Sequence, residues 1–470
     1  MSAAKGVIAK VKPAPVTREI AAWLAKLRHE DIPAETRHAL RLLVTDTFGA
    51  TLAGLGQPWT KSVTAWAERG ALPAGAKGLA TVWGEPTARF RPSDAALVNG
   101  TAAHAFELDD FHNAKLHPGA VVIPAAMAVA EARGIDGKRL ETAITAGYEV
   151  MIRTSLALDP SEGRLRGWHL TAICGTFGAA AAAAVLMGLD AERTAWALGL
   201  AGTQSGGLFA FNADGTMSKR LHPGRAAQAG IMAAELAELG LSGPTQIYEA
   251  EDGGFLWAYS SKSKTGPLID GLGSKWHATD TTFKPYSCCG SLHSYIDCAI
   301  DLRPRWKPGA RVRAGVAEVV NVQCGYPYRP GSELNAQMSI RYCIAIALLD
   351  GAALPGQFTP ERIADPAVTR LAQAIEVSHD PAQDKLYPGR YAAWVEIESA
   401  PKSNSFERNE RLDPSGHPSN PARDRTLMEK YNRLAGTVIG AGPAARLAAE
   451  IGAIERTNAA KLVRLLALPR

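Results

Sequence analysis

Four polar clusters in this chain combine histidine, lysine or carboxylate side chains with turn residues. The first lies within residues 99–124, where three carboxylates, two imidazoles and a lysine occupy eleven positions between Glu107 and His117. Apolar and small residues flank it on both sides, which favours a site that moves protons on a small acid. The alternative is a solvated loop in which Asp109 or Asp110 caps a helix. The HPG that follows predicts a helix start and leaves His117 free to face a cavity.

The second cluster is GWHLT, residues 167–171, and it directly precedes a run of small residues with helical character. The backbone N–H groups at a helix start bind carboxylates, and His169 is expected beside them. Arg164 and Arg166 add positive charge. A purely structural histidine is the alternative.

The third cluster, residues 214–225, places Lys219, Arg220, His222 and Arg225 within seven positions beside a turn. It resembles an anion cradle, in which a lysine clamps a carboxylate or acts as an acid when its pKa falls. A basic surface turn is the alternative.

The fourth cluster, residues 283–293, contains Lys284, an adjacent pair of cysteines and His293. Adjacent cysteines have poor zinc geometry, and no thiol dyad is evident. Lys284 and His293 are therefore the better candidates for chemistry.

No Walker, GxSxG, HExxH or GxGxxG motif occurs, so we expect a reaction without metal or cofactor. The 470 residues carry a net charge of only +5, and the basic residues are dispersed, which argues against nucleic-acid binding. The first sixteen residues lack an apolar signal core, and no apolar run of membrane-spanning length is evident. A cytoplasmic protein without membrane contact is expected.

The positioning elements are predicted to be closely packed, alanine-rich helices, which cover residues 93–105, 119–133, 139–158, 170–188, 191–206 and 224–240. The composition changes near residue 270. Beyond it we expect strands at 312–322 and 392–397, helices at 334–350 and 367–377, and an exposed loop at 402–425. Helical periodicity returns at 426–468, so the chain is expected to re-enter its first domain.

Taken in order, these motifs resemble the MmgE/PrpD family. The matching segments are LLVTDTFGATLAGL, NGTAAHAFELDD, LHPGAVVIPAAMA, GWHLTAICGTFGAAAAAA, GTMSKRLHPGRAAQAGIMAAELAELGLSGP and FKPYSCCGSLHSYIDCAIDL. The resemblance implies a mainly α fold: a large all-helical domain from residues 1–268 and 408–470, and a smaller α/β lid domain from residues 269–407. It also implies a homodimer with no metal or organic cofactor.

The resemblance also implies roles for individual residues in a cleft between the two domains. The expected catalytic side chains are His117, His169, Lys219 and His293, and the expected substrate-binding side chains are Glu107, Asp109, Lys284, Arg220, His222 and Tyr328. His117 and His169 are expected to form the acid–base pair, with the cations stabilising charge that develops beside a substrate carboxylate.

The family resemblance leaves several reactions open on a small di- or tricarboxylate. The main expectation is a hydro-lyase similar to 2-methylcitrate dehydratase. The alternatives are an epimerase similar to iminodisuccinate epimerase, a decarboxylase of a cis-aconitate-like acid, and a non-catalytic binder of small acids. The FHNAKLHPG segment departs from the dehydratase pattern, and the ELDD-x-H…HPG form is closer to the epimerase-like and uncharacterised branches. Substrate choice is expected to depend on the FHNAK insert before His117.

Overall fold

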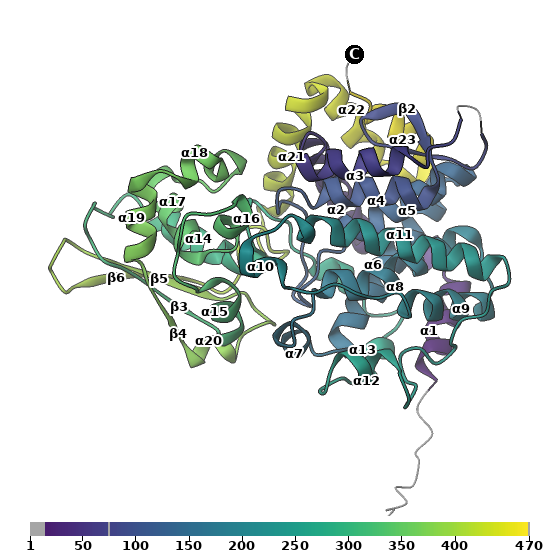
Figure 1. Ribbon diagram of the computed structural model, residues 1–470, viewed down its shortest axis with the longest axis horizontal. Coiled ribbons are helices and arrows are strands. Elements are labelled where there is room, and N and C mark those ends of the chain that lie inside the picture. The colour runs from purple at the N-terminus through teal and green to yellow at the C-terminus, as the bar shows by residue number, and fades with distance from the viewer. Residues whose placement is uncertain (1–14, 74–75, 469–470) are drawn as a thin grey trace, which may run out of the picture.

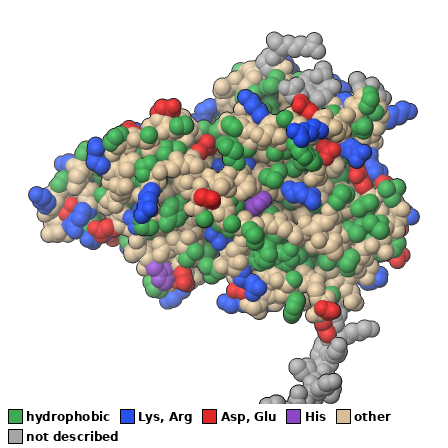
Figure 2. Space-filling model, in the orientation of Figure 1, with side chains coloured by type: hydrophobic (Ala, Val, Ile, Leu, Met, Phe, Trp, Pro, Cys, Tyr) green, Lys and Arg blue, Asp and Glu red, His purple; other side chains and the backbone are tan. Residues whose placement is uncertain are grey.

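The computed structural model describes residues 15–73 and 76–468. Figure 1 shows two lobes side by side, a large helical lobe and a smaller α/β lobe that we define as residues 286–411. The mainly helical class expected from the sequence is confirmed. Lys and Arg side chains are interspersed with Asp and Glu over the face drawn in Figure 2.

The helical lobe draws on both ends of the chain. Its N-terminal helices are α1 (Val16–Lys26), α2 (Ala34–Gly54), α3 (Pro58–Glu68), α4 (Pro92–Ala103), α5 (Gly119–Arg133), α6 (Gly137–Ala157), α7 (Pro160–Leu165), α8 (Leu170–Met187), α9 (Ala191–Gly202), α10 (Phe211–Asp214), α11 (Ser218–Glu238), α12 (Phe255–Tyr259) and α13 (Gly266–Ile269), with the 3₁₀ turns η1 (His29–Asp31) and η2 (His277–Asp280). Its C-terminal elements are α21 (Arg423–Ile439), α22 (Ala441–Gly452), η5 (Ile454–Arg456) and α23 (Ala459–Leu465). Because α21 and α22 pack against α2, and α23 packs against α5, the last helices complete the core begun by the first ones.

The alanine-rich helix α8 forms the centre of this lobe and packs against α5, α6, α9 and α11. A Cβ atom at Gly178 would lie 2.9 Å from the carbonyl oxygen of Gly147 on α6, so the two backbones approach too closely for any larger residue. By length and composition α8 could cross a membrane, contrary to the expectation that no segment could, but 94% of it is buried inside the protein. It is therefore a core helix.

A small hairpin departs from the expected all-helical domain. Strand β1 (Ala80–Val82) pairs antiparallel with β2 (Glu85–Phe90) across a turn in which Gly84 has a φ of +88°. The Asn99 side chain in α4 accepts a hydrogen bond from the backbone N–H of Trp83 and donates one to the carbonyl of Thr81. This tie from an adjacent helix fixes the short hairpin.

The α/β lobe contains a four-stranded sheet in the order β4-β3-β5-β6, with β3 parallel to β4 and antiparallel to β5. Helix α14 packs against β5 and β6 and is covered by α17 (Figure 1). The elements are η3 (Gly290–Leu292), α14 (His293–Leu302), β3 (Val312–Val316), α15 (Glu318–Cys324), α16 (Glu333–Gln337), α17 (Ile340–Asp350), η4 (Pro355–Phe358), α18 (Pro360–Ile363), α19 (Pro366–Ala374), β4 (Glu376–His379), α20 (Pro381–Asp384), β5 (Ala393–Glu398) and β6 (Phe406–Arg411).

Two sequence-based expectations for this lobe are wrong. The strand expected at 312–322 ends at Val316, because the Asp384 side chain accepts a hydrogen bond from the backbone N–H of Glu318 and α15 starts there. The loop expected at 402–425 contains the edge strand β6, which also crosses the lobe boundary expected at residue 407. Its charged sequence is typical of an edge strand, which must not pair with another chain.

Candidate active site

A small cavity lies where the two lobes meet, and it encloses about 50 Å³. The helical lobe contributes several lining side chains, among them His117, His169 and Lys219, and the α/β lobe contributes others, among them Cys289, Ser291 and Tyr387. The cavity therefore combines imidazole and ammonium groups from one lobe with hydroxyl and thiol groups from the other.

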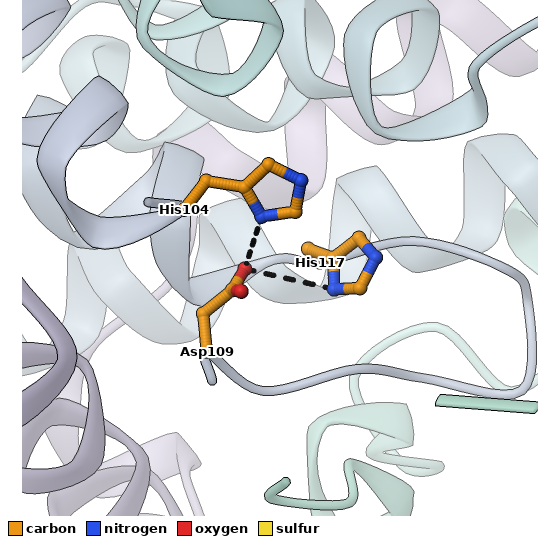
Figure 3. Close-up of side chains that lie close together, drawn as sticks. All are labelled: His104, Asp109 and His117. Atoms are coloured by element: carbon orange, nitrogen blue, oxygen red, sulfur yellow. Dashed lines mark hydrogen bonds and ion pairs between the residues drawn. The ribbon is translucent and has the colours of Figure 1, made fainter. Parts of the chain in front are cut away.

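One wall is built around the buried carboxylate of Asp109, which lies between two imidazole rings (Figure 3). His104, at the C-terminal end of α4, donates its Nδ1–H to Asp109 Oδ2 at 2.8 Å. The Nδ1 of His117 lies 3.6 Å from the same oxygen and donates to the backbone carbonyl of Asp110 at 2.8 Å. Since Nδ1 of His117 is the donor, its Nε2 carries the lone pair, and the ring lines the cavity.

The neighbouring carboxyl of Asp110 bonds other groups and not the two histidine rings. It accepts the backbone N–H of Gly119 at the start of α5 and the hydroxyl of Tyr148, so it caps the helix that follows His117. Burial raises the pKa of Asp110 to about 7. The helix-cap alternative considered for the acidic pair thus describes Asp110, whereas Asp109 contacts the two histidines.

A second imidazole faces the cavity from the N-terminal end of α8, where His169 is the residue preceding the helix, as expected from the sequence. Its Nδ1 lies 2.8 Å from the Nδ1 of His222, so one of these nitrogens is the donor and the other the acceptor. Burial lowers the pKa of His169 well below its usual range and that of His222 to about 4. Both rings are therefore uncharged near neutral pH.

Behind the histidines, the carboxylate of Glu107 is shared by three cations. Lys219 Nζ lies 2.6 Å and Lys284 Nζ 3.0 Å from its oxygens, and Arg220 pairs with it as well. Burial alone would raise the pKa of Glu107, but the surrounding cationic groups, Lys219 and Lys284 foremost, together outweigh it and hold the pKa well below the usual range. The cluster is therefore net positive, and Lys219 presents this charge to the cavity.

The pKa of His117 is set by groups that would let the ring gain a proton when a substrate carboxylate binds in the cavity. Burial lowers its pKa well below the usual range, and nearby Lys284 lowers it further, whereas Asp109 raises it. An added carboxylate in the cavity would act in the same direction as Asp109 and favour the imidazolium. The site can thus supply uncharged bases, an acid formed on substrate binding, and a fixed cation.

The structure brings together most of the predicted site residues. Three line the cavity, namely His117, His169 and Lys219, and five lie directly behind them, namely Glu107, Asp109, Arg220, His222 and Lys284. His293 is fully buried with its Nε2 3.4 Å from the Cys288 carbonyl, and Tyr328 packs against the tilted ring of Tyr342 inside the α/β lobe. Neither of these two lines the cavity.

Sequence reasoning did not select several residues that the structure places here. His104 lies within the NGTAAHAFELDD motif, five positions before Asp109. This short spacing was the sequence feature that could have predicted their contact. Lys115 and Arg164 also line the cavity, although their sequence context indicates only a general positive charge. Tyr387 lies far along the chain in a segment with no distinguishing motif, so only the fold could show its place.

Two groups in the described part of the chain have the residue types of a metal site: His104, Asp109 and His117, and separately His112, His277 and Asp280. In the first group, both nitrogens that face Asp109 are Nδ1 atoms, and each is a hydrogen-bond donor. In the second, His112 Nδ1 accepts the backbone N–H of Ala114. The Nδ1 atoms of the first group are thus already used in hydrogen bonds within the protein, whereas His112 Nε2 of the second group is buried without a hydrogen-bond partner.

The mainly helical fold agrees with the comparisons to known proteins. The MmgE/PrpD N-terminal domain matches residues 18–267, and the MmgE/PrpD C-terminal domain matches residues 286–456. The chain belongs to the MmgE/PrpD family.

Its relatives include cis-aconitate decarboxylases. The enzyme of Aspergillus terreus is 30% identical over 90% of each chain, and that of Homo sapiens is 31% identical over 76% of each chain. A cis-aconitate decarboxylase-like protein of Aspergillus oryzae is 29% identical over 96% of this chain and 97% of its own length. These relatives support the expected lyase class, and they favour the decarboxylase alternative over the hydro-lyase.

Proposed function

We propose that this protein is a carboxy-lyase that removes CO₂ from cis-aconitate or a closely similar unsaturated tricarboxylate. The observation that carries the proposal is a cavity between the two lobes lined by two uncharged imidazoles and a lysine, His117, His169 and Lys219, in a chain whose relatives are cis-aconitate decarboxylases.

The chemistry of such a substrate fits these groups. Breaking the bond between carbon and a departing carboxylate leaves an electron pair, which the conjugated double bond and its carboxylate can delocalise. One proton must then be delivered to carbon, so the trianion and one proton yield CO₂ and a five-carbon dicarboxylate. The substrate is its own electron sink, and the protein must supply only charge stabilisation and a proton donor.

Proton delivery is assigned to one of the two cavity imidazoles. Burial keeps both uncharged near neutral pH, and the charge of a bound trianion would raise their pKa. His117 is favoured as the donor because Asp109 stabilises its charged form. Lys219 faces the developing negative charge while Glu107 holds its ammonium in place.

The test is incubation with cis-aconitate while CO₂ release is followed, together with the absorbance of the conjugated acid. The expected result is stoichiometric CO₂ and loss of the tricarboxylate. Formation of a hydroxy acid without CO₂ would support the hydro-lyase instead. Exchange of carbon-bound hydrogen without either product would support an epimerase.

The proposal also includes an oligomeric state and a cellular compartment. We expect a homodimer, the state implied by the family resemblance, in the cytoplasm. Light scattering on the purified protein tests the first expectation, and cell fractionation tests the second.

A further inference from the structure

Two of the cations that line the cavity have no carboxylate partner among the described residues. Lys115 lies in the loop before His117, and Arg164 lies near the end of α7. The ammonium of Lys115 donates to the Tyr387 hydroxyl at 2.6 Å. The guanidinium carbon of Arg164 lies 3.4 Å from the centre of the Phe209 ring, and its Nε is buried with no hydrogen-bond partner.

This arrangement contrasts with the cations behind the site. Lys219 and Lys284 share the carboxylate of Glu107, whereas among the described residues no carboxylate forms an ion pair with Lys115 or Arg164, and the charge of Arg164 lowers the pKa of Lys115. Burial lowers the pKa of Lys115 to about 7, and burial also lowers the pKa of Arg164. Partly buried cations without a carboxylate partner carry a desolvation cost, so an anion is favoured at this place in the cavity.

The geometry around each group supports a ligand role. Lys115 has a φ of +60°, a left-handed conformation that is unfavourable for a residue with a side chain. Stacking on Phe209 fixes the plane of the Arg164 guanidinium and leaves its edge N–H groups for a planar carboxylate. The Tyr387 hydroxyl, which also hydrogen-bonds Ser291, places a polar group of the α/β lobe next to Lys115.

We propose that Lys115, Arg164 and the Tyr387 hydroxyl form a carboxylate subsite, which holds a carboxylate that does not react and selects tricarboxylates over dicarboxylates. This inference rests on the proposed function for its substrate class. Because Tyr387 belongs to the other lobe, a bound carboxylate at this subsite would contact both lobes.

The test is calorimetric binding of tricarballylate, a saturated tricarboxylate with no double bond to accept electrons, and of glutarate, a dicarboxylate of similar length. The variants are Arg164→Met and Lys115→Met. Arg166→Met is the matched control, because Arg166 ends the same helix but is exposed and faces Glu162 at 3.8 Å.

We expect both cavity variants to weaken tricarballylate binding about 10- to 100-fold, as for loss of a hydrogen bond to a charged group. Glutarate binding should change less than threefold, and the control should bind both acids as the unaltered protein does. Arg164→Lys should recover part of the lost affinity, because it restores the charge without the planar fork.

Unchanged tricarballylate binding in folded Arg164→Met and Lys115→Met would overturn the subsite. An equal loss for tricarballylate and glutarate would overturn its selectivity for the third carboxylate. The outcome is independent of turnover: if cis-aconitate releases no CO₂ but tricarballylate binding still depends on Arg164, the proposed function fails and the subsite stands.

Discussion

Replacing Asp109 with asparagine tests whether its charge, and not its shape, is needed in the site. The Oδ2 of Asp109 lies 3.6 Å from Nδ1 of His117. At an effective dielectric constant of about 20, unit charges this far apart attract by about 4–5 kcal/mol. That energy corresponds to roughly a thousandfold change in the protonated fraction of His117.

If protonated His117 delivers the proton to carbon, Asp109→Asn should lower kcat for CO₂ release by about 100- to 1000-fold. KM should change little, because Asp109 does not line the cavity. The assays are steady-state decarboxylation of cis-aconitate and NMR titration of the His117 ring in the tricarballylate complex. We expect the ring to be charged at neutral pH in the unaltered protein and uncharged in the variant.

Asp110→Asn is the matched control, because Asp110 is adjacent and equally buried but caps α5. With a pKa of about 7, its carboxyl is already close to the uncharged state that asparagine resembles. This variant should keep most of its activity. Turnover of Asp109→Asn within threefold of the unaltered enzyme would refute the reasoning about His117.

Three further changes test the surrounding groups. Glu107→Gln should destabilise the fold by about 3–5 kcal/mol, since it leaves buried cations without their carboxylate, and denaturant unfolding would measure it; a loss below about 1 kcal/mol would contradict the shared ion pair. His169→Ala and Lys219→Ala should each abolish turnover while circular dichroism shows the fold intact, and full activity in either would remove that residue from the mechanism. Lys115 is charged below its pKa of about 7 and uncharged above it, so kcat/KM should fall as the pH rises through 7. Lys115→Met should lack this part of the pH profile, and an unaltered profile would contradict the role of its charge.

Much of the helical lobe could be predicted from the sequence, because periodicity and end signals agree there. The helix expected at 119–133 has these bounds in the structure, and Gly134 and Gly188 end α5 and α8 in the left-handed conformation. His169 could be placed before α8 for the same reason. The third cluster was placed less well: α11 begins at Ser218, so Lys219 and Arg220 lie in its first turn and not in a preceding loop.

The rest depended on contacts between distant segments. β6 is polar because only one of its edges is paired, and such a segment is hard to distinguish from a loop by composition. His104 bonds Asp109, and Glu107 pairs with Lys219 and Lys284. The contacts with the two lysines form only when distant segments come together on folding. The subsite residue Tyr387 comes from the other lobe, and no local pattern marks it.

The most direct measurement is proton NMR of cis-aconitate turned over in heavy water. The proposed function predicts one CO₂ per substrate consumed and a five-carbon dicarboxylate. This product should carry a single deuteron, which the acid in the site delivers to carbon. Isotope should enter at one carbon position, and His117→Ala should produce none of this product. A six-carbon hydroxy acid, or deuterium exchange into unconsumed substrate without CO₂, would contradict the central claim.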